Sequence, residues 1–353
     1  MVELMQLLNQ AVERKGSDIY ILPGSPALLK VNGKMEPLSE QKVFPVDSEA
    51  FLKEAYALAQ NRDMEKLITT GDDDFSFSVK NMGRFRCNAY RQRGSFASVL
   101  RIVSFGLPDY RALGVPEAVM NLANTRRGMI LVTGPAGSGK STTLACIIDK
   151  INKEKSDHII TLEDPIEYLH PHKSSIVSQR EVLHDTVDYE HALRAALRQA
   201  PDVILLGEMR DYETISTALT AAETGHLLLS TLHTIGAAKT IDRVIDVFPA
   251  NQQQQVRIQL SMVLQAVVSQ QLMPSLQGGM VAAFEVMIVN TAIQNMIREG
   301  KVHQMDNVIY AGASQGMITI DADIQRLYGE GRISRDTALL YASNPDVLSK
   351  KLG

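Results

Sequence analysis

Apolar residues in the first hundred positions recur with two different periods. Leu4, Leu7, Leu8 and Val12 follow helical spacing, and a second helix is predicted over 47–60. Asn32-Gly33 lies between two strand-like segments and predicts a tight hairpin. Alternating or continuous apolar stretches predict strands at 19–22, 27–31, 34–38, 75–79, 84–90 and 96–103. We therefore expect a small α/β domain over residues 1–103.

Further along the chain, short apolar runs alternate with helical patterns. Residues 104–116 hold two glycines and two prolines, which is typical of a linker. The segments beyond it predict strands at 129–133, 158–162, 203–206 and 227–231, and helices from 141, near 188–198 and over 211–223. This βαβ rhythm predicts a mostly parallel sheet with helices on both faces. We expect a second domain over 117–353, with helices dominating from about 237 onward.

Composition and charge narrow the class of protein. The 353 residues are 45% hydrophobic and 22% charged, which is ordinary for a globular protein, and the formal charge is −4. A net negative charge argues against a nucleic-acid partner. No apolar run approaches the roughly 18–20 residues that cross a bilayer, and the N-terminus lacks the pattern of a secretory signal. Because Cys87 and Cys146 are the only cysteines, we expect a reducing, cytoplasmic setting.

The segment that follows the strand at 129–133 carries a specific chemical signature. Glycines at fixed spacing let backbone N–H groups surround the β- and γ-phosphates of a nucleotide. Lys140 adds a positive charge, and the Ser141 hydroxyl is a candidate Mg²⁺ ligand at a helix N-terminus. The predicted nucleotide-binding residues are Gly134, Pro135, Ala136, Gly137, Ser138, Gly139, Lys140, Ser141 and Thr142. The chain is therefore predicted to bind ATP or GTP.

Acidic residues follow two of the predicted buried strands. Glu163 and Asp164 end the strand at 158–162, and Glu208 follows the strand at 203–206. In open α/β sheets, ligands bind at the carboxyl ends of strands, where a carboxylate can hold or deprotonate the attacking water. Gly207 stands where a metal-binding Asp is usual in P-loop enzymes. Each acid taken singly is equally consistent with a solvated strand end.

Two histidines bracket the strand at 227–231. His226 and His233 are separated by seven residues, roughly 23 Å along an extended chain, so they cannot share one metal ion. A histidine beside a strand is most often simply hydrogen-bonded in place. The alternative is that one of the pair senses the γ-phosphate or bridges to a neighbouring subunit.

Arginines concentrate on the last strands of the first domain. Period-two alternation places Arg84, Arg86, Asn88 and Tyr90 on one face of the strand at 84–90. Arg101 has apolar neighbours on its own strand and therefore requires a partner. Such arginines form either a solvated strand face or an arginine finger that stabilises transition-state charge from another subunit.

The ordered set of motifs resembles the type II/IV secretion ATPase family. It comprises the phosphate loop, Glu163-Asp164-Pro165, the segment Leu205–Asp211 and the segment Thr224–His233. Residues 292–301 are similar to a segment of its pilus-retraction subgroup at eight of ten places, with Gln294 and Met296 departing. Exchanging Leu for Met is nearly neutral in volume. The resemblance runs essentially from end to end.

The resemblance implies a homohexameric ring of chains, each with a PAS-like N-terminal domain and a RecA-like motor domain. It implies ATP and Mg²⁺ as cofactors, Glu208 in hydrolysis, Glu163 near the water or metal, and His226 and His233 in a histidine box. Arg86 and Arg101 would reach a nucleotide at the subunit boundary. Hydrolysis would drive pilin out of the pilus base through an inner-membrane platform protein, from the cytoplasmic face of that membrane.

Three alternatives remain at this stage. Assembly ATPases of the same family usually carry an additional N-terminal region and a four-cysteine zinc module, and this sequence shows neither pattern. A DNA-translocating ATPase on a RecA-like core is disfavoured by the acidic net charge. A nucleotide-dependent switch with negligible turnover is supported only by Gly207 in place of Asp.

Overall fold

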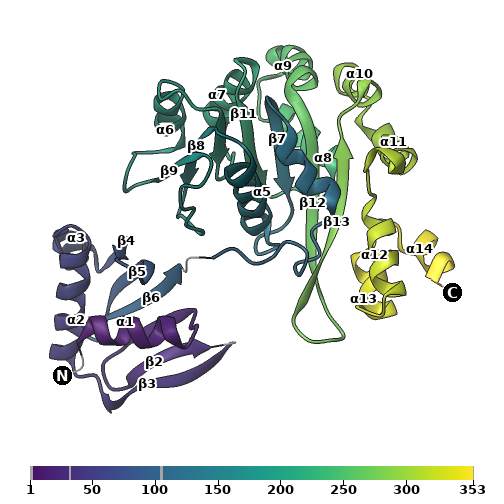
Figure 1. Cartoon of the computed structure of the whole chain (residues 1–353). Coiled ribbons are helices and arrows are strands. Elements are labelled where there is room, and N and C mark those ends of the chain that lie inside the picture. Colours follow the sequence, from purple (N-terminus) through teal and green to yellow (C-terminus); the bar gives the residue numbers. More distant parts are fainter. Residues whose placement is uncertain (1–2, 32, 104–105, 353) are drawn as a thin grey trace. The chain divides into compact units, whose positions relative to one another are not determined.

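The computed structural model describes residues 3–31, 33–103 and 106–352. These divide into two compact units (Figure 1). The first ends at Gly106 and also includes Glu167–Leu169, and the second comprises the rest from Leu107 onward. Residues 104 and 105 of the predicted linker lie outside the described residues, so the linker assignment stays a prediction.

The first unit is an antiparallel sheet with helices on one face. Its strands follow the order β3–β2–β1–β6–β5–β4, and every neighbouring pair is antiparallel. Buried side chains of α1, α2 and the sheet form one apolar cluster. The elements are α1 (Leu4–Glu13), β1 (Asp18–Ile21), β2 (Pro26–Val31), β3 (Lys34–Lys42), α2 (Pro45–Leu58), α3 (Glu65–Thr70), β4 (Asp72–Val79), β5 (Gly83–Gln92) and β6 (Ser95–Val103).

Period-two alternation correctly assigns the two faces of β5. Phe85, Cys87 and Ala89 are fully buried, whereas Arg86 and Asn88 point to the accessible face. The predicted hairpin is also present, because β2 and β3 pair with Val31 opposite Lys34. Asn32, half of its turn signal, lies outside the described residues. The short helix α3 was not predicted.

The second unit is an α/β layered structure around a mostly parallel sheet. Its strands follow the order β13–β12–β7–β11–β10–β8–β9, and only β12 and β13 pair antiparallel. The strands are β7 (Gly128–Thr133), β8 (His158–Glu163), β9 (Ile176–Glu181), β10 (Val203–Leu206), β11 (Leu227–Leu232), β12 (Leu264–Pro274) and β13 (Met280–Ile288). The predicted parallel sheet is therefore present.

Helices cover both faces of this sheet (Figure 1). One face packs against α5, with α4 and the 3₁₀ helix η1, and the other packs against α6 to α11. The bounds are α4 (Glu117–Met120), η1 (Asn121–Asn124), α5 (Lys140–Glu154), α6 (Tyr189–Ala196), α7 (Tyr212–Glu223), α8 (Ala237–Asp246), α9 (Ala250–Val263), α10 (Thr291–Glu299), η2 (Val302–Gln304), α11 (Met305–Ala311) and η3 (Ala313–Gln315).

The expectation that helices dominate after residue 237 is wrong in one part. The β12–β13 hairpin interrupts them and extends the sheet beyond β7. Apolar runs such as Val267-Val268 suit a buried strand and a buried helix equally, so periodicity alone cannot separate them. A third cluster packs this hairpin against α12 (Ile320–Gly329), α13 (Arg335–Tyr341) and α14 (Pro345–Leu352). Strand β9 was likewise not predicted.

Candidate nucleotide-binding site

The predicted phosphate loop connects the carboxyl end of β7 to the start of α5. Gly134 has φ 142°, and a Cβ there would lie 2.1 Å from the carbonyl oxygen of Gln270, so only glycine fits. Gly137 and Gly139 also have positive φ. Gly139 caps α5 without a side chain of its own, which leaves the first N–H groups of the helix facing the loop. This geometry is typical of a phosphate-binding loop.

Lys140 is held inside this loop. Its side chain is buried, and Nζ donates to the carbonyl oxygens of Gly134 at 3.0 Å and Pro135 at 2.9 Å. The buried Ser138 Oγ has no hydrogen-bond partner within the described part of the chain. A buried ammonium and an unsatisfied hydroxyl in one loop both fit an anionic ligand. Ser141 and Thr142 follow on the first turn of α5 and are half-buried.

Gln270 of β12 supports the loop from outside the motif, and sequence reasoning missed it. Its Nε2 donates to the Ser138 carbonyl oxygen, and its Oε1 accepts from Thr143 Oγ1 at 2.7 Å. Gln270 is 2% exposed, and these two hydrogen bonds satisfy both ends of its buried amide. No local signal could identify it, because its partners lie 127 and 132 residues earlier in the sequence.

The predicted carboxylates lie at the same edge of the sheet as the phosphate loop. Strands β7, β8 and β10 run parallel, so their carboxyl ends share that edge. Glu163 ends β8, is 9% exposed, and accepts from Thr161 Oγ1 at 2.7 Å. Glu208 follows β10 and pairs with Arg210 Nη2 at 2.5 Å. The structure thus brings both acids to the predicted edge.

The two histidines of the Thr224–His233 segment are separated by β11. His233 Nε2 lies 3.2 Å from Glu208 Oε2, so this histidine joins the carboxyl edge. His226 precedes β11 at the opposite edge, where its Nδ1 lies 3.0 Å from the Ala221 carbonyl oxygen and 3.2 Å from Thr224 Oγ1. This separation is the reason why we expect them not to share one metal ion. A catalytic role for either stays a prediction.

Oxygen donors at the carboxyl edge fit a Mg²⁺ ion. Ser141, Glu163, Asp164 and Glu208 supply hydroxyl and carboxylate oxygens, the ligands that Mg²⁺ prefers. Among the described residues no three His, Cys, Asp or Glu side chains gather closely enough to hold a metal. Mg²⁺ in nucleotide sites is commonly held by one or two protein groups together with phosphate oxygens, so the donor set is compatible with it.

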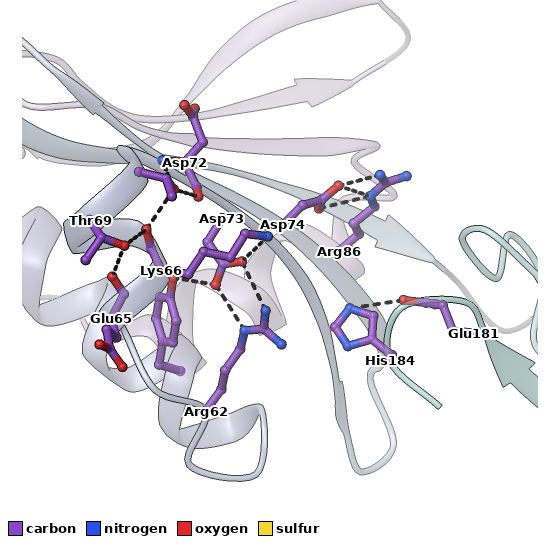
Figure 2. Close-up of polar contacts among 12 residues, drawn as sticks. Arg62, Glu65, Lys66, Thr69, Asp72, Asp73, Asp74, Arg86, Glu181 and His184 are labelled. Carbon is purple, nitrogen blue, oxygen red and sulfur yellow. Dashed lines mark hydrogen bonds and ion pairs between the residues drawn. The ribbon is translucent and has the colours of Figure 1, made fainter. Parts of the chain in front are cut away.

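The predicted arginine fingers lie on neighbouring strands of the first unit. Arg86 of β5 stands directly opposite Arg101 of β6. Each is paired with an acid: Arg86 with Asp74, as Figure 2 shows, and Arg101 with Asp18 at 3.0 Å. The Arg101 side chain is 69% exposed, whereas the Asp18 side chain is 8% exposed. Their role at a nucleotide stays a prediction.

A second acidic residue of this sheet has a structural role. Asp73 of β4 has a fully buried side chain that accepts a hydrogen bond from the Tyr56 hydroxyl. It also forms ion pairs with Arg62 and Lys66, which Figure 2 shows. These hydrogen bonds hold its pKa below the ordinary value, against burial, which acts in the opposite direction and is the largest single influence. The network ties α2 and α3 to the edge of the sheet.

Comparisons with known proteins agree with this geometry. The family described as Type II/IV secretion system protein matches residues 2–312. The type IV pilus retraction ATPase PilT of Pseudomonas aeruginosa is 44% identical over 98% of this chain and 99% of its own. A twitching motility protein of Neisseria gonorrhoeae is 48% identical over 78% of this chain and 74% of its own.

A solved structure extends the likeness to the fold. The crystal structure of the pilus retraction motor PilT with bound ADP superposes with a TM-score of 0.91 at 45% identity. It covers 99% of this chain and 100% of that chain. The predicted α/β fold, with an N-terminal domain and a RecA-like ATPase domain, is thereby confirmed. The chain belongs to the type II/IV secretion system protein family and is an ATPase.

Proposed function

We propose that this ATPase works as a homohexameric ring whose ATP hydrolysis powers retraction of type IV pili. The observation that carries the proposal is the convergence of the phosphate loop, Glu163 and the Glu208–His233 pair on one edge of the sheet. The end-to-end likeness to a pilus retraction ATPase supports pilus retraction rather than pilus assembly. The domain division 1–103, 104–116 and 117–353 fits a motor whose parts rotate about a linker.

The phosphate loop binds the nucleotide. Backbone N–H groups of the loop from Ala136 to Thr142 surround the phosphates, and Lys140 exchanges its loop carbonyl partners for phosphate oxygens. Ser141 is the residue that would hold Mg²⁺, with Glu163 beside it. When bound, such an ion would supply positive charge that offsets the charge developing on the phosphate oxygens. Gln270 keeps the loop in its binding shape from behind.

Hydrolysis requires a base beside the γ-phosphate. Glu208 is 13% exposed on its side chain and is oriented by Arg210 and His233, so its carboxylate is held in one direction. Glu208 polarises the attacking water, and Glu163 orders the neighbouring water or metal. His226, at the opposite edge, bears on the reaction only through the position of β11.

Arg86 and Arg101 complete the site from a neighbouring subunit. An arginine near the γ-phosphate stabilises the charge of the transition state. Both arginines now face carboxylates on an accessible sheet face, and each can exchange that partner for a phosphate. This arrangement makes hydrolysis depend on ring formation and couples it to movement of one chain against the next.

The ring acts on the pilus through another protein. We infer a cytoplasmic position at the inner membrane, reached by binding an inner-membrane platform protein that passes the motion to pilin. None of the helices in the described ranges is long and apolar enough to cross a bilayer, so membrane contact through a partner fits the chain. No nucleic acid takes part.

One cellular experiment distinguishes pilus retraction from pilus assembly. Cells that lose the gene, or carry Glu208→Gln, are expected to keep or gain surface pili and to lose twitching motility. Glu223→Gln, an exposed acid at the end of α7, serves as the matched control and should retain twitching. Loss of surface pili would instead indicate an assembly ATPase.

A biochemical experiment tests the ring and its substrate. The purified chain should form hexamers with Mg²⁺ and ATP and release phosphate, and Glu208→Gln should form the ring without turnover. A chain that stays monomeric and releases no phosphate would contradict the proposal. Stimulation of the rate several-fold by single-stranded DNA would favour a DNA-translocating ATPase.

A further inference from the structure

The position after β10 is a glycine because another side chain fills the space beside it. A Cβ at Gly207 would lie 2.6 Å from the Tyr189 hydroxyl oxygen and 3.2 Å from the Leu162 carbonyl oxygen. The backbone of Gly207 is itself fixed: its N–H donates to that carbonyl oxygen at 2.8 Å, and its oxygen accepts from Thr231 Oγ1 at 2.7 Å. An Asp at this position would therefore clash with the Tyr189 hydroxyl oxygen unless that side chain were displaced.

Tyr189 brings a hydroxyl to the edge where the carboxylates lie. It is the first residue of α6, whose start is fixed by Asp188 accepting from the His191 N–H at 2.8 Å. The ring packs against the apolar cluster beneath the sheet, while the hydroxyl reaches the mouth of β8 and β10. A phenol with an apolar body and a polar tip is suited to such a boundary.

The electrostatic surroundings keep this hydroxyl protonated. Burial raises the pKa of Tyr189 well above its ordinary value, and the negative charges of Glu208, Asp164 and Glu163 raise it further. At every working pH the group is therefore a neutral hydrogen-bond donor among carboxylates.

Granting the proposed hydrolysis at Glu208, we propose that the Tyr189 hydroxyl positions the attacking water. Other P-loop enzymes place a metal-binding Asp at the position of Gly207. In this chain the phenol of α6 takes that space and donates a hydrogen bond to the water that Glu208 polarises. Tyr189 acts with Glu208 on the chemical step and contributes little to nucleotide binding.

The first test removes only the hydroxyl. Tyr189→Phe keeps the ring and its packing, so the variant should fold and bind ADP with unchanged affinity by titration calorimetry. Its kcat for ATP hydrolysis should fall about tenfold or more, with KM changed less than about twofold. An unchanged kcat, or a loss that appears in KM instead, would overturn the proposal.

Tyr212→Phe is the matched control. Tyr212 is the first residue of α7, packs against the same apolar cluster, and its hydroxyl donates a hydrogen bond to Gln252 Oε1 at 3.1 Å. This variant should keep the wild-type kcat. If wild type, Tyr212→Phe and Tyr189→Phe all hydrolyse ATP with the same kcat, only the role of the Tyr189 hydroxyl is contradicted. If wild type releases no phosphate, the proposed function fails.

A double-mutant cycle gives an independent test. Gly207→Ala introduces a Cβ that displaces the Tyr189 hydroxyl, so it should lower both kcat and Tm. In Tyr189→Phe the nearest ring atom to that Cβ is Cζ at 3.4 Å, an ordinary contact, while the Leu162 carbonyl oxygen stays at 3.2 Å. The double variant should therefore recover most, but not all, of the lost Tm. Its kcat should equal that of Tyr189→Phe alone, because both changes remove one hydroxyl. Multiplied losses in kcat would overturn the proposal.

Discussion

The two ends of the parallel sheet carry similar side chains and use them differently. At the amino end, His158 lies with its Nδ1 3.0 Å from the Gln199 carbonyl oxygen, and His226 lies 3.0 Å from the Ala221 carbonyl oxygen. Asp202 accepts from the His158 N–H at 2.8 Å. These contacts mostly satisfy backbone groups. At the carboxyl end, His233 instead meets the side chain of Glu208.

Strand direction accounts for the difference. Parallel strands deliver their carboxyl ends to one edge, and α5 begins there with the positive end of its dipole. Acids and histidines at that edge face an anion-binding loop. The same residue types at the other edge face loops whose backbone they complete. The type of a residue therefore indicates its function only when the end of the strand at which the residue lies is also known.

The largest expected difference between the two ends concerns the lysines of α5. Lys140→Ala at the carboxyl end removes the loop's buried positive charge and should lower ATP hydrolysis at least about 10²-fold. Lys150 lies on the same helix, toward the amino end of the sheet, and pairs with Glu154. Lys150→Ala should therefore change the rate of ATP hydrolysis less than about twofold. Phosphate release at saturating ATP measures both. Equal losses would abolish the distinction between the ends.

Glutamines of β12 provide a second comparison. Gln270→Leu leaves the Ser138 carbonyl oxygen and the Thr143 hydroxyl without their partner, which should raise the KM for ATP about tenfold or more. Gln265→Leu, at the amino end of the same strand, loses only a contact to the Val263 carbonyl oxygen. Its KM should stay within about twofold of wild type. A Gln270 variant with wild-type KM would contradict the bracing role.

The histidines that bracket β11 should separate rate from stability. His233→Ala removes the contact to Glu208 and should lower kcat about fivefold to tenfold. His226→Ala loses a hydrogen bond to backbone, so it should cost about 1 kcal/mol of unfolding free energy and little kcat. Steady-state kinetics and urea denaturation distinguish them. A large kcat loss in His226→Ala would restore the equivalence that the sequence suggested.

The smallest expected effect is on the pH dependence of the unfolding free energy, and it comes from a buried histidine in the loop after β8. Burial lowers the pKa of His170 from 6.5 to about 4. Between these values the unfolded chain takes up a proton that the folded chain does not. The unfolding free energy therefore falls as pH drops from 6.5 toward 4, by about 1 kcal/mol at pH 6.

His170→Phe should remove this part of the pH dependence. The control His303→Asn changes an exposed side chain and should leave the profile as in wild type. Denaturant unfolding at pH 8, 6 and 5 supplies the comparison. A profile in His170→Phe identical to wild type would show that His170 takes up protons as readily in the folded chain as in the unfolded chain.

Local sequence patterns were sufficient for much of the site. The glycine spacing after β7, the acids at the ends of β8 and β10, and the face of β5 that carries Arg86 all follow from short-range periods. These features depend on backbone geometry within a few residues, which is encoded where it acts. The β12–β13 hairpin was missed because short apolar runs do not reveal their pairing partner.

The sequence by itself determined that a phosphate loop opens a helix after a buried strand, with carboxylates on following strands. Only the tertiary structure decided that Gln270 supports that loop, that Tyr189 fills the space beside Gly207, and that His233 rather than His226 meets Glu208. These contacts join residues far apart in the chain. Packing of helices and strands sets which such side chains meet, and no local period records it.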